Sequence, residues 1–303
     1  MIDLSKIPAA FVEAHDLPRP QWKVLHELIP ADASLAQRHA LWCEIQRQWL
    51  TRLRDALSEP YQLMESDHLF ILTAYRGDAN WMIEYAERAY SAIDDLVHDV
   101  LPKDRFGKLV ILIFGGEARF WQYVRYYHPA TSTREAAGVF IRDGDAHIAI
   151  ATMQKFRMIA AHEMAHAVVS HLKLPTWVDE GIAQRISRQI TRRGISDAAP
   201  DIDRHRDYWK THGVQGFWSG TSFKCSDDRT RLMVYELSEL LVDAMAALDR
   251  KTFKAFLGEA GRADAGDGAC RKHYGLGLEV WMKQVLGPGL RWAPQPALWE
   301  NIA

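Results

Sequence analysis

One stretch of the chain, "FRMIAAHEMAHAVVSHL" (156–172), is apolar around most of its circumference and yet carries His162, Glu163 and His166. The spacing of its apolar residues predicts a helix. In a helix, positions i and i+4 lie on one face, so the two imidazoles converge, while Glu163 projects about 100° round from His162. A buried helix does not carry such side chains unless they are paired or bound. We therefore expect a polar centre on this helix.

The pattern His-Glu-x-x-His on a helix is typical of a zinc site in which the two histidines bind the metal and the glutamate acts as a base. A zinc ion lowers the pKa of a bound water from about 15.7 to about 7, so that the glutamate can take its proton. The same pattern arises by chance in roughly 3% of chains of this composition. On these residues alone, a second interpretation stays open: two core histidines without a metal.

The next stretch, "LPTWVDEGIAQRIS" (174–187), offers a third ligand. A catalytic zinc ion usually has three protein ligands and an open fourth position. Pro175 ends the first helix, Trp177 can anchor a turn, and "DEGIAQ" begins another helix, which can bring Glu180 back to the metal. The alternative is that Asp179 and Glu180 only stabilise the N-terminus of the second helix through its dipole. After the His-Glu-x-x-His pattern, we favour Glu180 as a ligand.

The rest of the chain predicts an ordered series of elements. An irregular lead up to Pro30 is followed by a helix capped by Asp32 or Ser34, a strand at 67–75 and a helix at 81–100. A buried strand at 108–116, a short aromatic helix and two strands around an Asp143-Gly144 turn at 138–152 come next. From Phe156 onward the chain is expected to be mainly helical, apart from a loop region around 193–226. Strands in the first half and helices in the second predict an α+β protein with a mixed sheet, an antiparallel edge hairpin and a mainly helical C-terminal half.

Composition excludes several classes of protein. The formal net charge of −2 gives no basic surface, so we expect no nucleic-acid partner. No stretch approaches 18 apolar residues, and the N-terminus lacks the pattern of a secretory signal, so we expect no membrane association. Cys43, Cys225 and Cys270 are scattered, which fits a reducing compartment. These features predict a cytoplasmic protein.

The two motifs together resemble those of the gluzincin metallopeptidases, in particular the compact bacterial peptidase MA-like group, in which HExxH is followed by Pro-x-Trp-x-x-Glu-Gly-x-Ala. The similarity spans roughly residues 66 to 287. "GVFIRDGDAHIAIAT" resembles the edge hairpin that lies along the cleft in such enzymes, and "RLMVYELSELLVDAM" and "HYGLGLEVWMKQVLG" resemble later helices. The resemblance implies a zincin-like fold in which the sheet and its edge hairpin pack on the HExxH helix.

The resemblance also implies a domain organisation. An N-terminal helical lead (1–65) would pack on the body, and a C-terminal tail (288–303) would follow the zinc metallopeptidase domain (66–287). That domain would comprise a sheet subdomain (66–153) and a helical subdomain (154–287).

Carried over residue by residue, the resemblance implies that His162, His166 and Glu180 bind one Zn²⁺ per chain. Glu163 becomes the general base and acid for the hydrolysis of peptide bonds by a zinc-bound water. The implied partner is a peptide or protein substrate, and the simplest activity is that of an endopeptidase; the oligomeric state is not predicted. Related enzymes stabilise the oxyanion with a tyrosine or histidine beyond the third ligand.

Tyr235 is our candidate for this role, because it is expected to open a helix in the right region; a core tyrosine is the alternative. His205 and Tyr208 are weaker candidates. Thermolysin-like relatives have an aspartate four residues after the ligand glutamate, where this chain has Gln184, so Asp179 is considered as a substitute partner for a zinc histidine. The chain also lacks the Gly-x-Met-Glu-Asn motif of aminopeptidases.

Three further features have simpler interpretations. His171 is expected to be a surface residue, and the arginines of "QRISRQITRR" (184–193) are expected to form a solvated helix face. "GFWSGTSF" (216–223) can cover or line a cleft.

A competing function is that of a binding protein or regulator with the same fold and little turnover, although the intact Glu163 argues against it.

Overall fold

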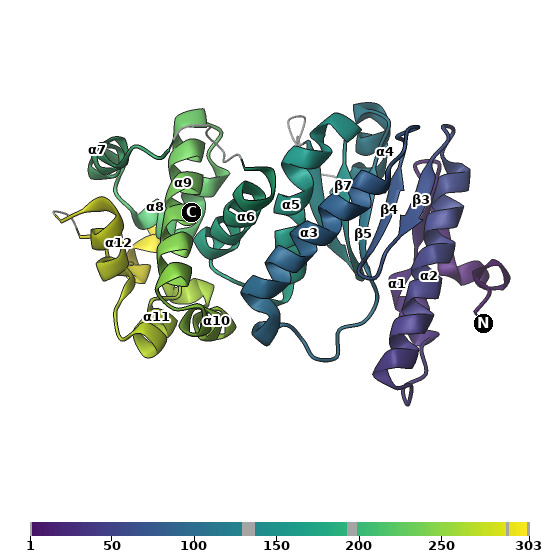
Figure 1. Cartoon of the computed structure of the whole chain (residues 1–303), viewed down its shortest axis with the longest axis horizontal. Helices are drawn as coiled ribbons and strands as arrows, with labels where there is room; N and C mark the ends of the chain where they lie inside the picture. Colours follow the sequence, from purple (N-terminus) through teal and green to yellow (C-terminus); the bar gives the residue numbers. More distant parts are fainter. Residues whose placement is uncertain (1, 129–136, 193–198, 289–290, 302–303) are drawn as a thin grey trace. The chain divides into compact units, whose positions relative to one another are not determined.

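The computed structural model describes residues 2–128, 137–192, 199–288 and 291–301 (Figure 1). The chain is an α+β protein with one five-stranded mixed sheet and mostly helical content, as predicted. It divides into two compact units. The first comprises Met1–Tyr90 and Pro102–Ala167, and the second comprises Ser91–Leu101 and Val168–Ala303.

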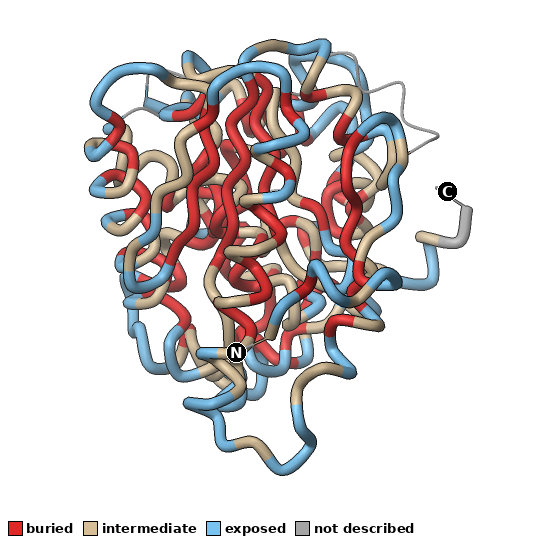
Figure 2. Tube along the Cα trace, turned by 90° about the vertical axis from the view of Figure 1, so that its right-hand side faces the viewer, coloured by how far each residue is buried: buried red, intermediate tan, exposed pale blue. Residues whose placement is uncertain are grey.

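The first unit contains the sheet, whose strand order is β3-β4-β5-β7-β6. Its strands are β3 (Gln62–Glu65), β4 (Leu69–Thr73), β5 (Leu109–Ile113), β6 (Gly138–Asp143) and β7 (Asp145–Ile150). The three central strands are parallel, and both edge strands are antiparallel to their neighbours. Every residue of β4 and β5 is buried (Figure 2), and all of these residues except Thr73 are apolar, as expected for strands covered on both faces. The strands expected at 67–75, 108–116 and 138–152 are confirmed, whereas β3 was not predicted.

Helices cover both faces of this sheet. They are α1 (Trp22–Glu27), α2 (Leu35–Ala56), α3 (Asn80–Val97), α4 (Glu117–Tyr127) and α5 (Met153–Val169). Side chains of α2 and α4 form one core cluster with alternate residues of β4 and β5. Helices α3 and α5 lie on the side of the sheet away from α2 (Figure 1). Ser34 caps α2 in a capping box with Gln37, which confirms one of the two caps expected for this helix.

The N-terminal segment is not an irregular lead, contrary to the prediction. Strand β1 (Phe11–Ala14) pairs with β2 (Leu17–Pro20) before α1 begins. Arg19 of β2 is fully buried, donates to the carbonyl oxygen of Gln122 at 3.0 Å, and lies with its guanidinium 4.4 Å from the ring centroid of Tyr123. These contacts join residues about a hundred positions apart, so local sequence does not predict them.

The turn between β6 and β7 lies where the Asp143-Gly144 pair predicted it. Gly144 has φ +69°, and a Cβ atom there would lie 2.1 Å from the Cβ of Trp22. Next to it, Gln46 Nε2 donates to Asp145 Oδ2 at 2.9 Å and to the carbonyl oxygen of Lys108 at 2.7 Å. The segments α1 and α2 therefore fix the end of this hairpin.

The second unit is helical. Its α-helices are α6 (Thr176–Thr191), α7 (Ile202–His212), α8 (Gln215–Ser219), α9 (Asp228–Leu248), α10 (Arg250–Glu259), α11 (Asp267–Tyr274) and α12 (Leu278–Leu286). The described residues of both units also form short 3-10 helices: η1 (Leu4–Lys6), η2 (Pro8–Ala10), η3 (His98–Val100), η4 (Ser170–Leu172), η5 (Thr221–Lys224), η6 (Arg262–Asp264) and η7 (Pro296–Asn301). The loop region expected around 193–226 instead contains α7, α8 and η5. Helix α7 was not predicted because most of its residues are polar and only His205, Tyr208 and Trp209 are buried.

Within the described part of the chain, no helix is long and apolar enough to cross a membrane.

Two titratable residues of β7 lie in unusual environments. His147 is fully buried, with its Nε2 2.8 Å from the hydroxyl of Tyr123, and burial lowers its pKa to about 3. Burial raises the pKa of the Asp145 carboxyl to about 6. Between pH 6 and 4 the unfolded chain protonates His147 and the folded chain does not, so this group lowers the free energy of unfolding as the pH falls. Asp145 has the opposite effect, because its folded state takes up the proton.

We predict that His147→Gln removes the effect of His147 on the pH dependence of stability and leaves the opposite effect of Asp145. As the pH falls from 6 to 4, the free energy of unfolding of the variant should rise relative to that of the wild type, by about 1.4 kcal/mol for each pH unit. Urea unfolding at three pH values measures this difference. The exposed Val12 provides the control, since Val12→Gln neither adds nor removes a titratable group and should leave the slope unchanged. Parallel pH curves for wild type and His147→Gln would contradict the burial argument.

Candidate metal centre

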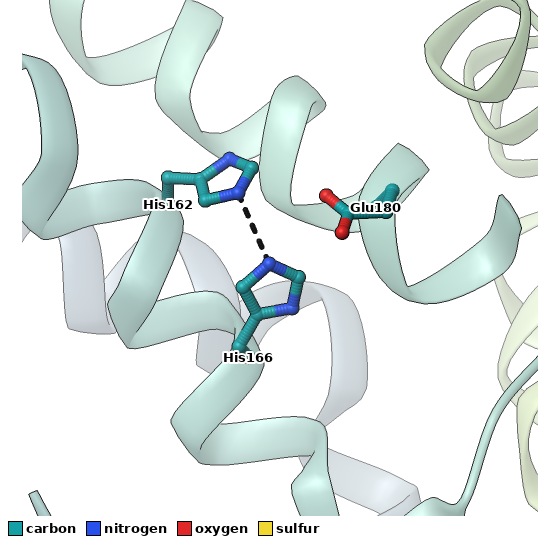
Figure 3. A group of neighbouring side chains, drawn as sticks. All are labelled: His162, His166 and Glu180. Carbon is teal, nitrogen blue, oxygen red and sulfur yellow. Dashed lines mark hydrogen bonds between the residues drawn. The ribbon is translucent and has the colours of Figure 1, made fainter. Parts of the chain in front are cut away.

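Helix α5 positions the two histidines of the motif. Its flanking residues Ala161 and Ala165 are fully buried, whereas His162 and His166 are half-buried. Their Nε2 atoms lie 3.0 Å apart, and their rings are nearly perpendicular (Figure 3). Two ligands at about 2.0–2.1 Å from one tetrahedral ion are themselves separated by about 3.3 Å. The spacing of the two nitrogen atoms therefore fits a pair of ligands to one ion.

Glu180 completes a group of three. One ligand atom each from His162, His166 and Glu180 lies within 4.8 Å of the others, and Figure 3 shows the carboxylate directed toward the two rings. Among the described residues, this is the one cluster of three or more His, Cys, Asp or Glu side chains that could hold a metal. Two imidazoles and one carboxylate are a donor set that suits zinc and leaves a fourth position open. The residues present thus fit the ion that the motif suggests.

The turn that returns the chain to Glu180 is held by several contacts. After η4, Lys173 adopts a left-handed backbone conformation with φ +51°. The Nε of Arg262 donates to the carbonyl oxygen of Leu174 at 2.9 Å, and the Nε1 of Trp177 donates to that of Ala265, also at 2.9 Å. Trp177 is therefore an anchor of the turn, as predicted. Helix α6 begins at Thr176, earlier than the expected "DEGIAQ", so Glu180 lies in its second turn.

The residue after Glu180 sets the spacing of two helices. A Cβ atom at Gly181 would lie 2.5 Å from the carbonyl oxygen of Ser238 and 2.6 Å from the side chain of Val242, both in α9. Only glycine permits this approach of the α6 backbone to α9. The position of Glu180 is therefore tied to α9 through its immediate neighbour.

Ion pairs reinforce the contact between α6 and α9. Arg185 pairs with Asp243, and Arg188 binds both carboxylate oxygens of Glu239, which is 3% exposed. Burial raises the pKa of Glu239, and the Arg188 guanidinium opposes that shift. The prediction that these arginines form a solvated helix face is therefore wrong for Arg185 and Arg188. Arg192 forms the C-cap of α6, and Arg193 lies outside the described residues.

Tyr235 does not open a helix, contrary to the expectation, but lies well inside α9. It is half-buried, and its ring meets that of Phe223 edge-on at 5.7 Å. It comes one helical turn before Ser238, the residue that Gly181 contacts. Tyr235 and Glu180 thus lie on neighbouring turns of α9 and α6.

The two weaker candidates belong to the core of the second unit. The Nε2 of His205 lies 3.0 Å from Glu236, and burial lowers the pKa of this histidine. The hydroxyl of Tyr208 lies 2.7 Å from that of Thr230. Both side chains are almost completely buried.

The remaining predicted residues are placed as follows. Glu163 is half-buried on α5, and Asp179 is half-buried in the first turn of α6. Gln184 is buried one turn after Glu180. His171 is not a free surface residue, because its two ring nitrogens lie 3.1 and 3.0 Å from the carbonyl oxygens of Val168 and Val100.

The chain matches no family model, and a search of curated proteins finds no match either. The resemblance to the gluzincin metallopeptidases thus depends on the sequence motifs alone.

We predict that Gly181→Ala lowers the free energy of unfolding by about 1–3 kcal/mol, because the added methyl group would force α6 away from α9. Gly258 of α10 is the matched control, since a Cβ atom there would meet only Val100 at 3.5 Å, an ordinary contact. Gly258→Ala should be neutral or raise the free energy of unfolding by up to about 1 kcal/mol through helix propensity. Equal effects of the two substitutions in urea unfolding would refute the close contact at Gly181.

Proposed function

We propose that the protein is a zinc-dependent metallopeptidase with a zincin-like, gluzincin-type arrangement, and most simply an endopeptidase. His162, His166 and Glu180 would hold one Zn²⁺ per chain. The observation that carries the proposal is that these three donors, two from one helix and one from the next, come together. The glutamate of the motif directly follows the first of them in the sequence. The proposed substrate is a peptide or protein, and nucleic acid is not expected.

The bound zinc ion would supply a Lewis acid that polarises the peptide carbonyl and lowers the pKa of the attacking water. Glu163 follows His162 directly on α5, and its carboxylate would accept a proton from that water as the oxygen bonds to the carbonyl carbon. The same carboxyl group would then pass the proton to the amide nitrogen while the C–N bond breaks. Water is consumed, and a carboxylic acid and an amine are released.

In this proposal Tyr235 assists the reaction, and one further feature, the edge strand β6, supports hydrolysis of an extended peptide. The hydroxyl of Tyr235 would donate a hydrogen bond to the carbonyl oxygen as negative charge develops there. Strand β6 is the edge strand of the five-stranded sheet, so it offers backbone groups to which a substrate strand can add. Gly138, at the start of β6, packs so closely on Ile159 of α5 that a Cβ atom would lie 2.4 Å from its side chain. Since Ile159 precedes His162 by one turn, the edge strand begins beside the motif helix.

The cytoplasm is the proposed compartment. Cys43, Cys225 and Cys270 are all free thiols, which fits a reducing environment.

The first prediction from this proposal concerns zinc content. Protein purified without added zinc should contain about one zinc per chain by metal analysis, and Glu180→Ala should lower zinc affinity at least about tenfold while retaining the fold. Glu259→Ala, which removes an exposed glutamate paired with Lys272, is the control and should retain the metal. Undiminished zinc in Glu180→Ala would remove this residue from the ligand set.

The second prediction separates an enzyme from a binding protein of the same fold. Glu163→Gln preserves the size of the side chain and removes its basicity, so zinc content should be unchanged while kcat for peptide hydrolysis falls about 10²–10⁴-fold. Chelator-sensitive cleavage of a mixed peptide library provides the assay. Cleavage that survives Glu163→Gln at the wild-type rate would refute the proposed role of this glutamate. Bound zinc without any cleavage by the wild type would favour the binding protein.

A further inference from the structure

The segment formed by α8 and η5 is fixed firmly to the second unit. The Nε1 of Trp218, a buried residue, donates to the carbonyl oxygen of Trp292 at 2.8 Å. Gln215 donates to the carbonyl oxygen of Ala293 at 3.0 Å and accepts from the backbone N–H of Gln295 at 2.9 Å. Side chains on this segment therefore have defined positions.

The same segment reaches the first turn of α6. Gly220, between α8 and η5, has φ +84°, and a Cβ atom there would lie 2.6 Å from Oγ1 of Thr176. Thr176 precedes Glu180 by four positions, which is about one helical turn. Thus η5 begins beside the turn of α6 that leads to Glu180.

From there, η5 carries Phe223 to α9. The Phe223 ring lies 5.8 Å from that of Phe217, which is fully buried, and 5.7 Å from that of Tyr235. Both Phe223 and Tyr235 are half-buried. The three rings form a row that starts in the core and ends with two partly exposed aromatic side chains close to the helix of Glu180.

We propose that Phe223 is a specificity-determining residue. Its exposed part, together with the ring of Tyr235, would form an apolar subsite that accepts an aromatic or large aliphatic side chain of the substrate peptide. This inference rests on the proposed function, because it places a peptide at the centre that includes Glu180. A single apolar contact of this kind changes the preference between substrates by about 10–200-fold.

Binding is tested on the Glu163→Gln protein, in which turnover is expected to be strongly slowed. The probes are blocked hexapeptides of alanine and glycine in which phenylalanine replaces alanine at each position in turn, with binding measured by calorimetry. We expect phenylalanine at one position to strengthen binding at least about tenfold. The additional substitution Phe223→Ala should abolish this preference, and Phe223→Leu should retain part of it.

Tyr274, a half-buried aromatic residue of α11 in the same unit, gives the matched control. Tyr274→Leu should leave the preference unchanged. Tyr235→Phe, tested with Glu163 intact, should lower kcat for the preferred and the all-alanine peptide by the same factor, because it removes a hydroxyl and keeps the ring. A preference that persists in Phe223→Ala, or the absence of any preferred position, would overturn the inference.

The two proposals fail in different ways. Zinc-dependent, Glu163-dependent cleavage with no effect of Phe223→Ala on preference would overturn the subsite alone. Absence of both zinc and cleavage would overturn the proposed function, and a binding preference that still depends on Phe223 would then support the subsite.

Discussion

The arrangement of the candidate centre depends on two imidazole nitrogens that face each other at 3.0 Å on an otherwise apolar helix. Without a metal, one of the two nitrogens must carry a proton, and the other must accept it. With a metal, both nitrogens would offer a lone pair to the same ion. The buried residues on either side of the histidines hold α5 in the fold, so the backbone positions from which the two rings project are fixed.

The third donor depends on glycine as much as on the glutamate itself. Gly181 lets α6 approach α9, and Gly220 lets the start of η5 approach the first turn of α6. These two contacts hold the turn of Glu180 from either side, and the ion pairs of Arg185 and Arg188 extend the contact with α9. In our proposal, the same packing brings Tyr235 and Phe223 to the neighbourhood of the metal.

Local patterns predicted much of this arrangement. The spacing of His162 and His166, the apolar strands and the return of the chain through Trp177 are all encoded within a few residues, and the structure contains each of them. Contacts between distant segments were not predictable. The burial of Arg19 among tyrosines, the pairing of α6 arginines with α9 acids and the place of Tyr235 inside a helix all depend on partners far along the chain. Most of the wrong predictions concern polar residues. A charged side chain on a helix is predicted to be exposed to solvent unless its partner, far along the chain, is known.

The central claim is that His162, His166 and Glu180 bind one zinc ion, and anomalous diffraction at the zinc absorption edge tests it most directly. Crystals of protein purified without added metal should show one anomalous-difference peak per chain. This peak should lie about 2.0–2.2 Å from Nε2 of His162, from Nε2 of His166 and from a carboxylate oxygen of Glu180. No peak at this position, or a zinc ion bound by other residues, would contradict the account.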